Sequence, residues 1–427
     1  MARSYREEQP LARISEVHLD GLAARAGEGD PLDLLLKEGA KLLLEAALQA
    51  EIDERLGRGR YDRREDGQEG YRNGSRTRSL TTGVGELEVE VPRVRGLEEP
   101  FSSEVLARRV QITSGVQAFL PELYKHGLST RDFAPALGEH LGQAGLSKSS
   151  VSRTCAQLKD EFAAWQQRSL SGEEVVYLFL DGVYLPVRQN SKEKEGVLVA
   201  HGIRADGSRV LLAVSLGYRE STANWKDFLA DLIRRGLPSP KLVICDGNQG
   251  LLRAVGEAWP ETGLQRCIAH RMRNVLDKCP KAHHEAVKRG LRAIFYAEDE
   301  AEARRLAAQF TDRWEREFPA MTRCLTSALD SCLTFYRFPP EHWQRIRTSN
   351  ILERCFKEVR RRTNVVGRFP TEESALTLVW AVLVGDTAKW RGVKMAGPTL
   401  RLIEQAAADL PKSCWAINAM EEERKAA

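Results

Sequence analysis

The sequence contains no apolar stretch long enough to cross a membrane, and its first residues lack the apolar core of a signal peptide. We therefore expect a cytoplasmic protein rather than a secreted or membrane-embedded one. Hydrophobic residues make up 42% of the 427 residues and charged residues 29%, which is typical of soluble globular proteins. The chain exceeds the size of one compact core, so roughly two to four domains are expected.

Cysteine is present, but without the crowding that marks a disulfide-stabilised fold. The eight cysteines are scattered, at positions 155, 245, 267, 279, 324, 332, 355 and 414. A chain of this size can fold without cross-links, so we interpret them as reduced thiols. Acidic and basic residues nearly balance, with a net charge of +4, yet basic residues are concentrated locally.

The amino-terminal region changes its pattern several times. Residues 1–30 are charged and weakly patterned, and we interpret them as a loose leader. Pro31 to Leu56 has the apolar spacing of a helix, which would pack within an amino-terminal domain or a dimer. Gly57 to Arg78 interleaves glycine and arginine and is predicted to be a solvated loop, with a DNA-facing loop as the alternative. Val84 to Val94 alternates as a half-exposed strand does.

Between Phe119 and Phe162 the pattern predicts three helical pieces separated by two breaks. Each break, Gly127–Arg131 and Gly145–Arg153, offers a serine or threonine that can cap the next helix. This layout predicts a helix-turn-helix DNA-binding domain over residues 119–170, although other helical hairpins share the pattern. A recognition helix reads bases from its first turn. The predicted DNA-binding residues here are Arg131, Ser147, Lys148, Ser149 and Arg153.

The centre of the chain switches to strands. Val175 to Arg188 is a run of mainly apolar residues that predicts a strand buried on both faces, and it contains one carboxylate, Asp181. An aspartate in such a place is more often a turn former or a helix cap. A second apolar run ends in Asp246. The predicted order is strands 175–188, 196–204 and 209–215, helix 222–235, strand 241–247, a helix to 259 and strand 264–268.

This order is that of a ribonuclease H-like α/β core. In that fold the first and fourth strands lie side by side, so Asp181 and Asp246 would face one another. The stretch from 281 to 340 is charge-rich, has no strand signal and is interpreted as an all-helical insertion into the core. The expected divisions are 1–30, 31–118, 119–170, the core at 171–280 and 341–390, the insertion at 281–340, and a tail at 391–427.

A basic helix is predicted from Asn350 onward. Glu353, Lys357 and Arg360 are spaced to share one face, which is either a surface salt-bridge face or a functional one. Residues 345–368 contain eight basic residues against two acidic ones, a balance that favours a polyanion as the partner. The predicted DNA-binding residues of this helix are Arg354, Lys357, Arg361 and Arg362.

Two aspartates on neighbouring strands and a glutamate on a later helix would form an all-oxygen site for hard cations such as Mg²⁺ or Mn²⁺. Two such ions about 4 Å apart can activate an attacking oxygen and stabilise the leaving oxygen of a phosphodiester. Asp181 would bridge both ions, and Asp246 and Glu353 would each hold one. The alternative is a helix-turn-helix regulator in which these carboxylates are structural.

Several ordered motifs together resemble the mutator-type transposases of bacterial insertion sequences. The likeness extends from about Leu34 to about Val384 and is carried by Asp181-Gly-Val-Tyr-Leu-Pro-Val-Arg, Cys245-Asp-Gly-Asn-Gln-Gly, Gln265-Arg-Cys-Ile-Ala-His-Arg-Met-Arg-Asn and Thr348-Ser-Asn-Ile-Leu-Glu-Arg. The resemblance implies that Asp181, Asp246 and Glu353 are the catalytic, metal-binding triad, with Arg360 as the family's basic follower. One departure is Ile268, where many members carry an aromatic residue.

The same resemblance implies an activity and its partners. The protein would be a DNA transposase that binds terminal inverted repeats, cuts a strand with two metal ions and joins the freed 3′-hydroxyl to target DNA. It would act as a homodimer or larger synaptic assembly in the bacterial cytoplasm, associated with the nucleoid. A metal-dependent, structure-selective nuclease on the same fold, which cuts without joining, is the alternative.

Cys267 and His270 match the family's Cys-x-x-His motif and lie near the predicted site. They could bind zinc together with Cys279, His283 and His284. They could instead form a buried structural pair, or lie on a DNA-facing surface where His270 contacts the scissile region. The predicted DNA-binding residues of this stretch are Arg271 and Arg273.

Overall fold

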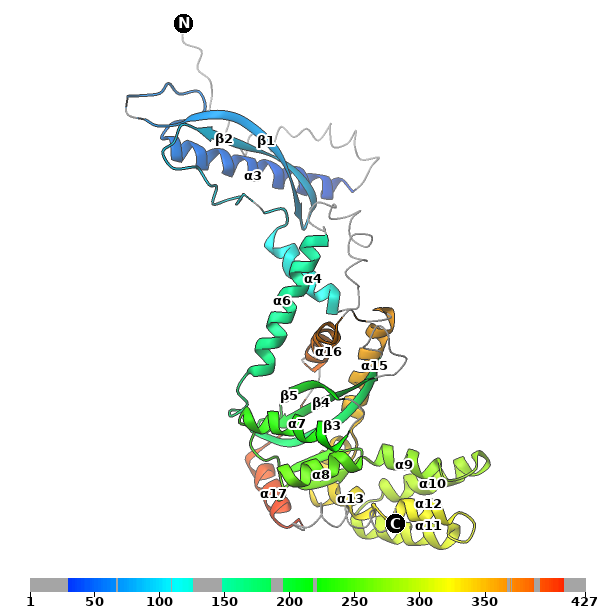
Figure 1. The fold of residues 1–427 in the computed structure, drawn as a ribbon. Helices are drawn as coiled ribbons and strands as arrows, with labels where there is room; N and C mark the ends of the chain where they lie inside the picture. The colour runs from blue at the N-terminus through cyan, green and yellow to red at the C-terminus, as the bar shows by residue number, and fades with distance from the viewer. Residues whose placement is uncertain are drawn as a thin grey trace. The chain divides into compact units, whose positions relative to one another are not determined.

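A computed structural model describes residues 30–66, 68–108, 110–125, 148–185, 195–217, 221–366, 369, 371–387 and 392–410. The chain divides into two compact units, Met1–Gln157 and Leu158–Ala427, which are taken separately below (Figure 1). Within the described ranges, no helix has both the length and the apolar character needed to span a bilayer.

The amino-terminal unit is built on one long helix and one hairpin. Helix α3 (Pro31–Leu56) begins where the Asp30 side chain accepts a hydrogen bond from Leu32 N, and it ends at Gly57 with a left-handed φ of 64°. It lies along the antiparallel pair of β1 (Tyr71–Thr82) and β2 (Gly85–Arg95) (Figure 1). Their shared core contains Leu48 of the helix together with Leu80, Leu87 and Val89 of the hairpin.

The predicted arginine-rich loop is wrong over its last third, because β1 starts at Tyr71. Half of the residues of this strand are exposed, and burial begins only near Leu80, so no apolar alternation marks the strand in the sequence. Backbone pairing with β2 holds it, reinforced by Thr77 Oγ1, which donates to Glu90 Oε1 at 2.6 Å. Arg72 forms an ion pair with Asp53 of α3, so this arginine binds the protein itself.

The middle of the predicted helix-turn-helix, residues 126–147, lies outside the described residues. The structure describes α4 (Ser114–Lys125) at the start of the predicted domain and α6 (Lys148–Gln167) towards its end. Arg131 and Ser147 are not among the described residues. The side chains of Lys148 and Ser149 are not described either. Arg153, on α6, is exposed.

A five-stranded sheet forms the centre of the carboxyl-terminal unit. Its order is β5 (Arg209–Gly217), β4 (Glu195–Arg204), β3 (Val175–Leu185), β6 (Leu242–Cys245) and β7 (Gly263–Arg266). Strands β3, β4 and β5 run antiparallel, whereas β6 runs parallel to β3 and β7 parallel to β6. The predicted adjacency of the first and fourth strands is therefore confirmed.

Alternation along β3 assigns its residues to two faces of the sheet. Leu178 and Leu180 join the apolar cluster that also contains Trp225 of α7 (Thr222–Arg234) and Leu251 of α8 (Gln249–Ala258). Tyr177 and Phe179 point the other way, and Tyr177 hydrogen-bonds His342 of α14 (Pro340–Ile346) at 2.8 Å. Asp181 belongs to this second face.

The insertion is helical throughout, as predicted. After α9 (Ile268–Leu276) it comprises η2 (Lys281–His283), α10 (His284–Phe295), α11 (Glu300–Trp314), α12 (Pro319–Thr326), α13 (Leu329–Leu333), η3 (Thr334–Arg337) and α14. It has its own apolar core, which includes Leu291, Phe295 and Phe310. The strand predicted to reach residue 268 ends earlier, because Ile268 already begins α9.

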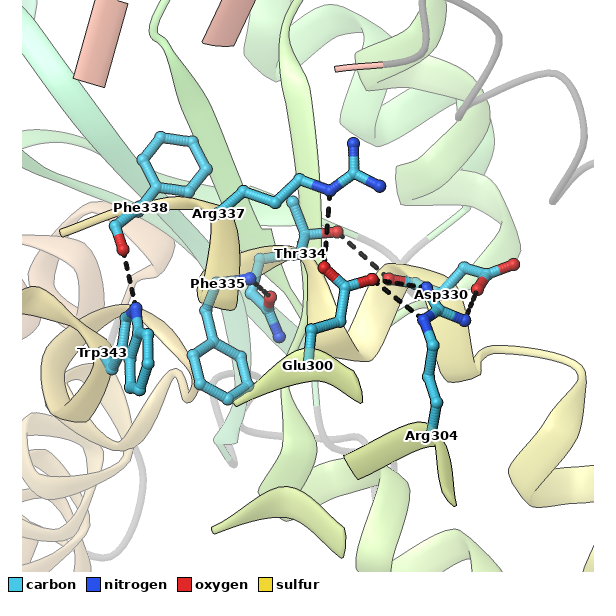
Figure 2. Close-up of polar contacts among 9 residues, drawn as sticks. Glu300, Arg304, Asp330, Thr334, Phe335, Arg337, Phe338 and Trp343 are labelled. Carbon is cyan, nitrogen blue, oxygen red and sulfur yellow. Dashed lines mark hydrogen bonds and ion pairs between the residues drawn. The ribbon is translucent and has the colours of Figure 1, made fainter. Parts of the chain in front are cut away.

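Hydrogen bonds and ion pairs connect the helices of the insertion to one another and to the sheet (Figure 2). Glu300 accepts from Arg304 at 2.6 Å, and Arg304 also pairs with Asp330 at 2.6 Å. Buried Gln265, on β7, accepts from Phe335 N at 2.8 Å and donates to Cys332 O at 2.9 Å. The chain then continues through α15 (Asn350–Val366), α16 (Glu372–Thr387) and α17 (Gly397–Ala408), the last within the predicted tail.

Candidate active site

Asp181 lies within β3, the central strand of the sheet. It is 7% exposed, and its Oδ1 accepts a hydrogen bond from Gly182 N at 2.8 Å. The residues that precede it on β3 are apolar and nearly inaccessible to solvent. A carboxylate in such a strand loses hydration that neighbouring groups must replace.

Asp246 comes directly after β6, the strand beside β3. Phe179 is the partner of Ile244 in the parallel register, so two further residues along each strand bring Asp181 level with Asp246. Asp246 Oδ1 accepts from Asn248 N at 2.8 Å, and Asn248 in turn caps α8. The turn between them needs Gly247, whose φ is 89°.

The electrostatics of Asp181 reflect its position. Burial raises the pKa of Asp181 to about 7, and the Asp246 carboxylate adds to the rise. His270 acts in the opposite direction, as do hydrogen bonds from Gly182 N and the Ser349 hydroxyl. The positive charge of His270 and these hydrogen bonds therefore offset only part of the rise that burial and Asp246 cause.

Glu353 lies in the first turn of α15, a helix that contacts β3. Its Oε1 is 3.4 Å from His270 Nε2 and 3.3 Å from Arg273 Nη2. Burial lowers the pKa of His270, but a hydrogen bond with Cys267 and the charges of Asp181 and Glu353 outweigh it and raise the value to about 9. His270 is thus a cation adjacent to carboxylates from β3 and α15.

The donor set suits a hard divalent cation, because all three side chains offer carboxylate oxygens. A cation beside Asp181 would also offset the desolvation and the repulsion from Asp246 that raise its pKa. Among the described side chains, no three of His, Cys, Asp or Glu are already grouped as metal ligands. Glu353, which is turned to His270 and Arg273, would have to exchange these contacts to join the aspartates.

Comparison with known proteins decides the family. Residues 15–392 match the family described as Transposase, Mutator family. The chain is 38% identical over 356 residues to the transposase for insertion sequence element ISRM5 of Rhizobium meliloti (strain 1021), an alignment that covers 83% of this chain and 88% of that protein. The chain belongs to the Mutator family of transposases. The resemblance predicted from the sequence is confirmed.

Other relatives of this Mutator family member span several bacterial groups. It is 41% identical over 275 residues to the transposase for IS6120 of Mycolicibacterium smegmatis, which covers 64% of this chain and 85% of that protein. It is 32% identical over 337 residues to the transposase for IS256 in transposon Tn4001 of Staphylococcus aureus, and this alignment covers 77% of this chain and 84% of that protein.

In this transposase family member, Cys267 and His270 contact residues of the site. Cys267 is fully buried, and its Sγ accepts a hydrogen bond from Ser349 N at 3.2 Å. His270 Nδ1 lies 3.5 Å from Ser349 Oγ. Of the alternative zinc ligands, His284 Nε2 contacts Cys279 O at 3.1 Å, and the His283 ring packs against Phe318.

The prediction that Arg271 and Arg362 bind DNA is corrected, because both arginines are buried. Arg271 is 5% exposed and donates to Cys324 O at 2.7 Å within the insertion. Arg362 is 8% exposed and pairs with Glu358 on its own helix. In contrast, Arg354 and Arg361 are exposed. Arg273, Lys357 and Arg360 are also exposed, and the last two lie on the helix of Glu353 as the spacing predicted.

Two residues of the site were not singled out from the sequence. Ser349 is a buried cap residue before α15, and a serine before a helix is a common sequence signal with no specific link to catalysis. Arg266 is 4% exposed at the end of β7, and its Nη2 donates to Gly247 O at 3.1 Å. A Cβ on Gly247 would lie 2.2 Å from Arg266 Nε, so the guanidinium packs directly on the turn that follows Asp246.

Proposed function

We propose that this protein is the DNA transposase of a bacterial insertion sequence. It binds the terminal inverted repeats of its element, cuts a strand at each end and joins the freed 3′-hydroxyl to target DNA. The observation that carries the proposal is the placement of Asp181, within β3, beside Asp246, which directly follows the adjacent parallel strand β6, with Glu353 linked to Asp181 through His270. Family membership supplies the class of substrate.

The proposed core is ribonuclease H-like, and the strand order β5-β4-β3-β6-β7 supports it. Mg²⁺ or Mn²⁺, as two ions held by Asp181, Asp246 and Glu353, would supply activation of the attacking oxygen and charge stabilisation of the leaving oxygen. Hydrolysis breaks the bond between phosphorus and the 3′-oxygen and leaves a 3′-hydroxyl and a 5′-phosphate. Strand transfer then exchanges one phosphodiester for another, so no external energy source is needed.

The chain's own residues orient the carboxylates and add positive charge near the substrate. Backbone amides of Gly182 and Asn248 orient the two aspartates. His270 and Arg273 hold Glu353 and add positive charge beside an anionic substrate.

Exposed basic residues of α15 are proposed to contact the DNA backbone, because phosphate contacts set the register of a duplex on a protein. They are Arg354, Lys357, Arg360 and Arg361. Base reading is assigned to the proposed helix-turn-helix that ends in α6. Two element ends must be held together for joining, so a homodimer or larger synaptic assembly is proposed.

The decisive experiment is a cleavage and joining assay with the full chain, Mg²⁺ and labelled duplexes that carry the element ends. Asp181→Asn should remove both products, whereas Asp227→Asn, at an exposed position of α7, should remove neither. Cleavage without joined product would favour the nuclease. Binding of the ends with neither reaction would favour a regulator.

A further inference from the structure

We infer that the outward face of helix α3 is a dimerisation surface, on which α3 of a second copy of this chain packs antiparallel. The helix belongs to the amino-terminal unit and packs on the hairpin of β1 and β2 with its other face (Figure 1). The inference rests on the proposed function in one respect, because it assigns a surface to the homodimer proposed there. It does not involve the carboxylate site.

The outward face of α3 is apolar. Of the five leucines that are exposed among the described residues, four lie on this helix. They are Leu32, Leu35, Leu36 and Leu43, with exposed fractions of 59%, 42%, 50% and 56%. With 3.6 residues per turn they project from one side, and no charged residue between positions 32 and 50 falls on that side. An exposed apolar face of this kind marks an interaction surface.

The residues along the centre of this face are spaced alternately by four and three positions, which is the spacing of a helix that pairs with another helix. They are Leu32, Leu36, Gly39, Leu43, Ala46 and Ala50. The first half of this series is rich in leucine, and the last two members are alanines. The series is therefore uneven in size along the helix.

This unevenness fits a second copy that runs in the opposite direction. In an antiparallel pair centred on the middle of the series, every leucine faces a small residue, since position 32 meets 50, position 36 meets 46 and position 43 meets 39. The contact is self-complementary, as a twofold dimer requires. A parallel pair would place leucine on leucine at one end and alanine on alanine at the other, which leaves the alanine end poorly packed.

A hollow of about 670 Å³ lies beside the alanine end of the face. Its helical wall includes Leu42, Ala46 and Ala50, and the hairpin supplies other walls. Two charged residues that line it, Arg72 and Asp53, already form an ion pair with each other. The hollow therefore offers room at the end of α3 where an antiparallel second copy brings its protruding leucines.

Gly39 is an independent observation that points to a close neighbour. A Cβ at this position would meet no atom of the chain within 4 Å, so the folded chain itself has no steric need for glycine there. Glycine weakens the interior of a helix relative to alanine. The close approach of a leucine from a second copy explains why this position in the middle of the face lacks a side chain.

The first test measures the dimer dissociation constant of full-length proteins by sedimentation equilibrium without DNA. Leu43→Glu places a charge in the proposed interface and should raise this constant at least tenfold, because apolar anchors dominate such contacts. Leu402→Glu, on α17, is the matched control, since both leucines are 56% exposed on a helix. It should stay within about twofold of wild type. An unchanged dissociation constant in Leu43→Glu would overturn the inference.

A second variant separates specific packing from general apolar attraction. Gly39→Leu adds an apolar side chain to an already apolar face. If the face only attracts other apolar surfaces, this variant should associate more strongly than wild type, and the inference fails. If α3 of a second copy packs closely there, the added side chain blocks the approach, and the dissociation constant should rise at least tenfold.

Cysteine cross-linking tests the direction of the pair. Leu32→Cys and Ala50→Cys proteins, mixed and mildly oxidised, should form a disulfide-linked dimer that neither variant forms alone and that wild type, with its native cysteines, does not form. Equal cross-linking by each variant alone would indicate a parallel pair and overturn the inference. No cross-link in the mixture would mean that another segment, such as residues 1–29 of the same chain, or another protein covers the face.

These measurements also distinguish the inference from the proposed function. Leu43 is exposed in the single chain, so Leu43→Glu should keep the circular dichroism of wild type; should it not fold, Leu36→Gln is measured with the same expectations. If wild type dimerises through α3 but does not cut element ends, the proposed function fails and the inference stands. If wild type cuts and Leu43→Glu dimerises normally, the inference alone fails.

Discussion

The strand half and the helix half of the candidate site are held in different ways. Asp181 lies within β3 and Asp246 directly follows the adjacent strand β6, and backbone amides one and two residues further on bind their carboxylates. Glu353 lies on a helix, its side chain is 32% exposed, and it is held by the side chains of His270 and Arg273. Backbone groups fix a position, whereas long side chains can exchange partners.

This difference divides the site into a preformed part and an adjustable part. Asp181 and Asp246 lie beside one another, and burial together with repulsion from Asp246 makes Asp181 ready to bind a cation but prone to protonation near neutral pH. The glutamate is neutralised in advance by His270 and Arg273. A complete set of three carboxylates would then form only when Glu353 leaves these partners, and the following predictions test that division from the largest effect to the smallest.

Loss of either strand carboxylate should have the largest effect. Asp181→Asn and Asp246→Asn should each lower cleavage on the order of 10³-fold or more, as expected when one member of a catalytic unit is removed. DNA affinity in a gel-shift titration should remain near that of wild type. Cleavage within tenfold of wild type by either variant would remove that aspartate from the chemistry.

The turn after Asp246 should be the next most sensitive position. Gly247→Ala places a methyl 2.2 Å from Arg266 Nε at a φ of 89°, so we expect destabilisation of about 1–3 kcal/mol and weaker cleavage. Urea unfolding measures the first effect and the cleavage assay the second. Gly385→Ala, in α16 where a Cβ meets nothing within 4 Å, is the control. Equal behaviour of the two variants would show that the turn does not constrain Asp246.

Substitutions of exposed arginines of α15 should weaken DNA binding, whereas substitution of a buried one should destabilise the protein. Arg354→Ala and Arg361→Ala should weaken DNA binding and lower the slope of affinity against salt by about one per lost phosphate contact. Arg362→Ala should instead lower the free energy of unfolding, because Arg362 is buried against Glu358. A salt slope that changes for Arg362 and not for Arg354 would reverse this assignment.

The smallest effect is expected where Glu353 meets Arg273. An exposed ion pair contributes roughly 0.2–1 kcal/mol, so Arg273→Ala should release Glu353 at little cost and lower the Mg²⁺ concentration for half-maximal cleavage by about two- to fivefold. Arg292→Ala, an exposed arginine of α10, should leave this concentration unchanged. An increased Mg²⁺ requirement for Arg273→Ala would mean that Arg273 supports the active position of Glu353.

Elements with strong local signals could be predicted from the sequence. Helix α3 has the predicted bounds because Asp30 caps its start and Gly57 ends it. The buried strands β3 and β6 were found because their apolar runs are continuous, and their order along the chain indicated that they would be neighbours.

Features that depend on tertiary contacts could not be predicted in this way. Strand β1 has too few buried residues to leave an apolar pattern. In the sequence Arg271 cannot be told from a surface arginine, because its partner, the carbonyl of Cys324, comes beside it only when the insertion folds. The contacts of Ser349 with Cys267 and His270 depend on segments that meet only in the folded chain.

The three residues from 265 to 267 face three different parts of the molecule. Gln265 binds the insertion, Arg266 packs on the turn after Asp246, and Cys267 accepts a hydrogen bond from Ser349, the residue before α15. If β7 shifted by one residue relative to its neighbours, all three side chains would lose their contacts at once. Single-residue deletions or insertions in this short strand should therefore be far less tolerated than equal changes in the exposed turn at 298–299. Length, more than side-chain chemistry, is the property that this segment must preserve.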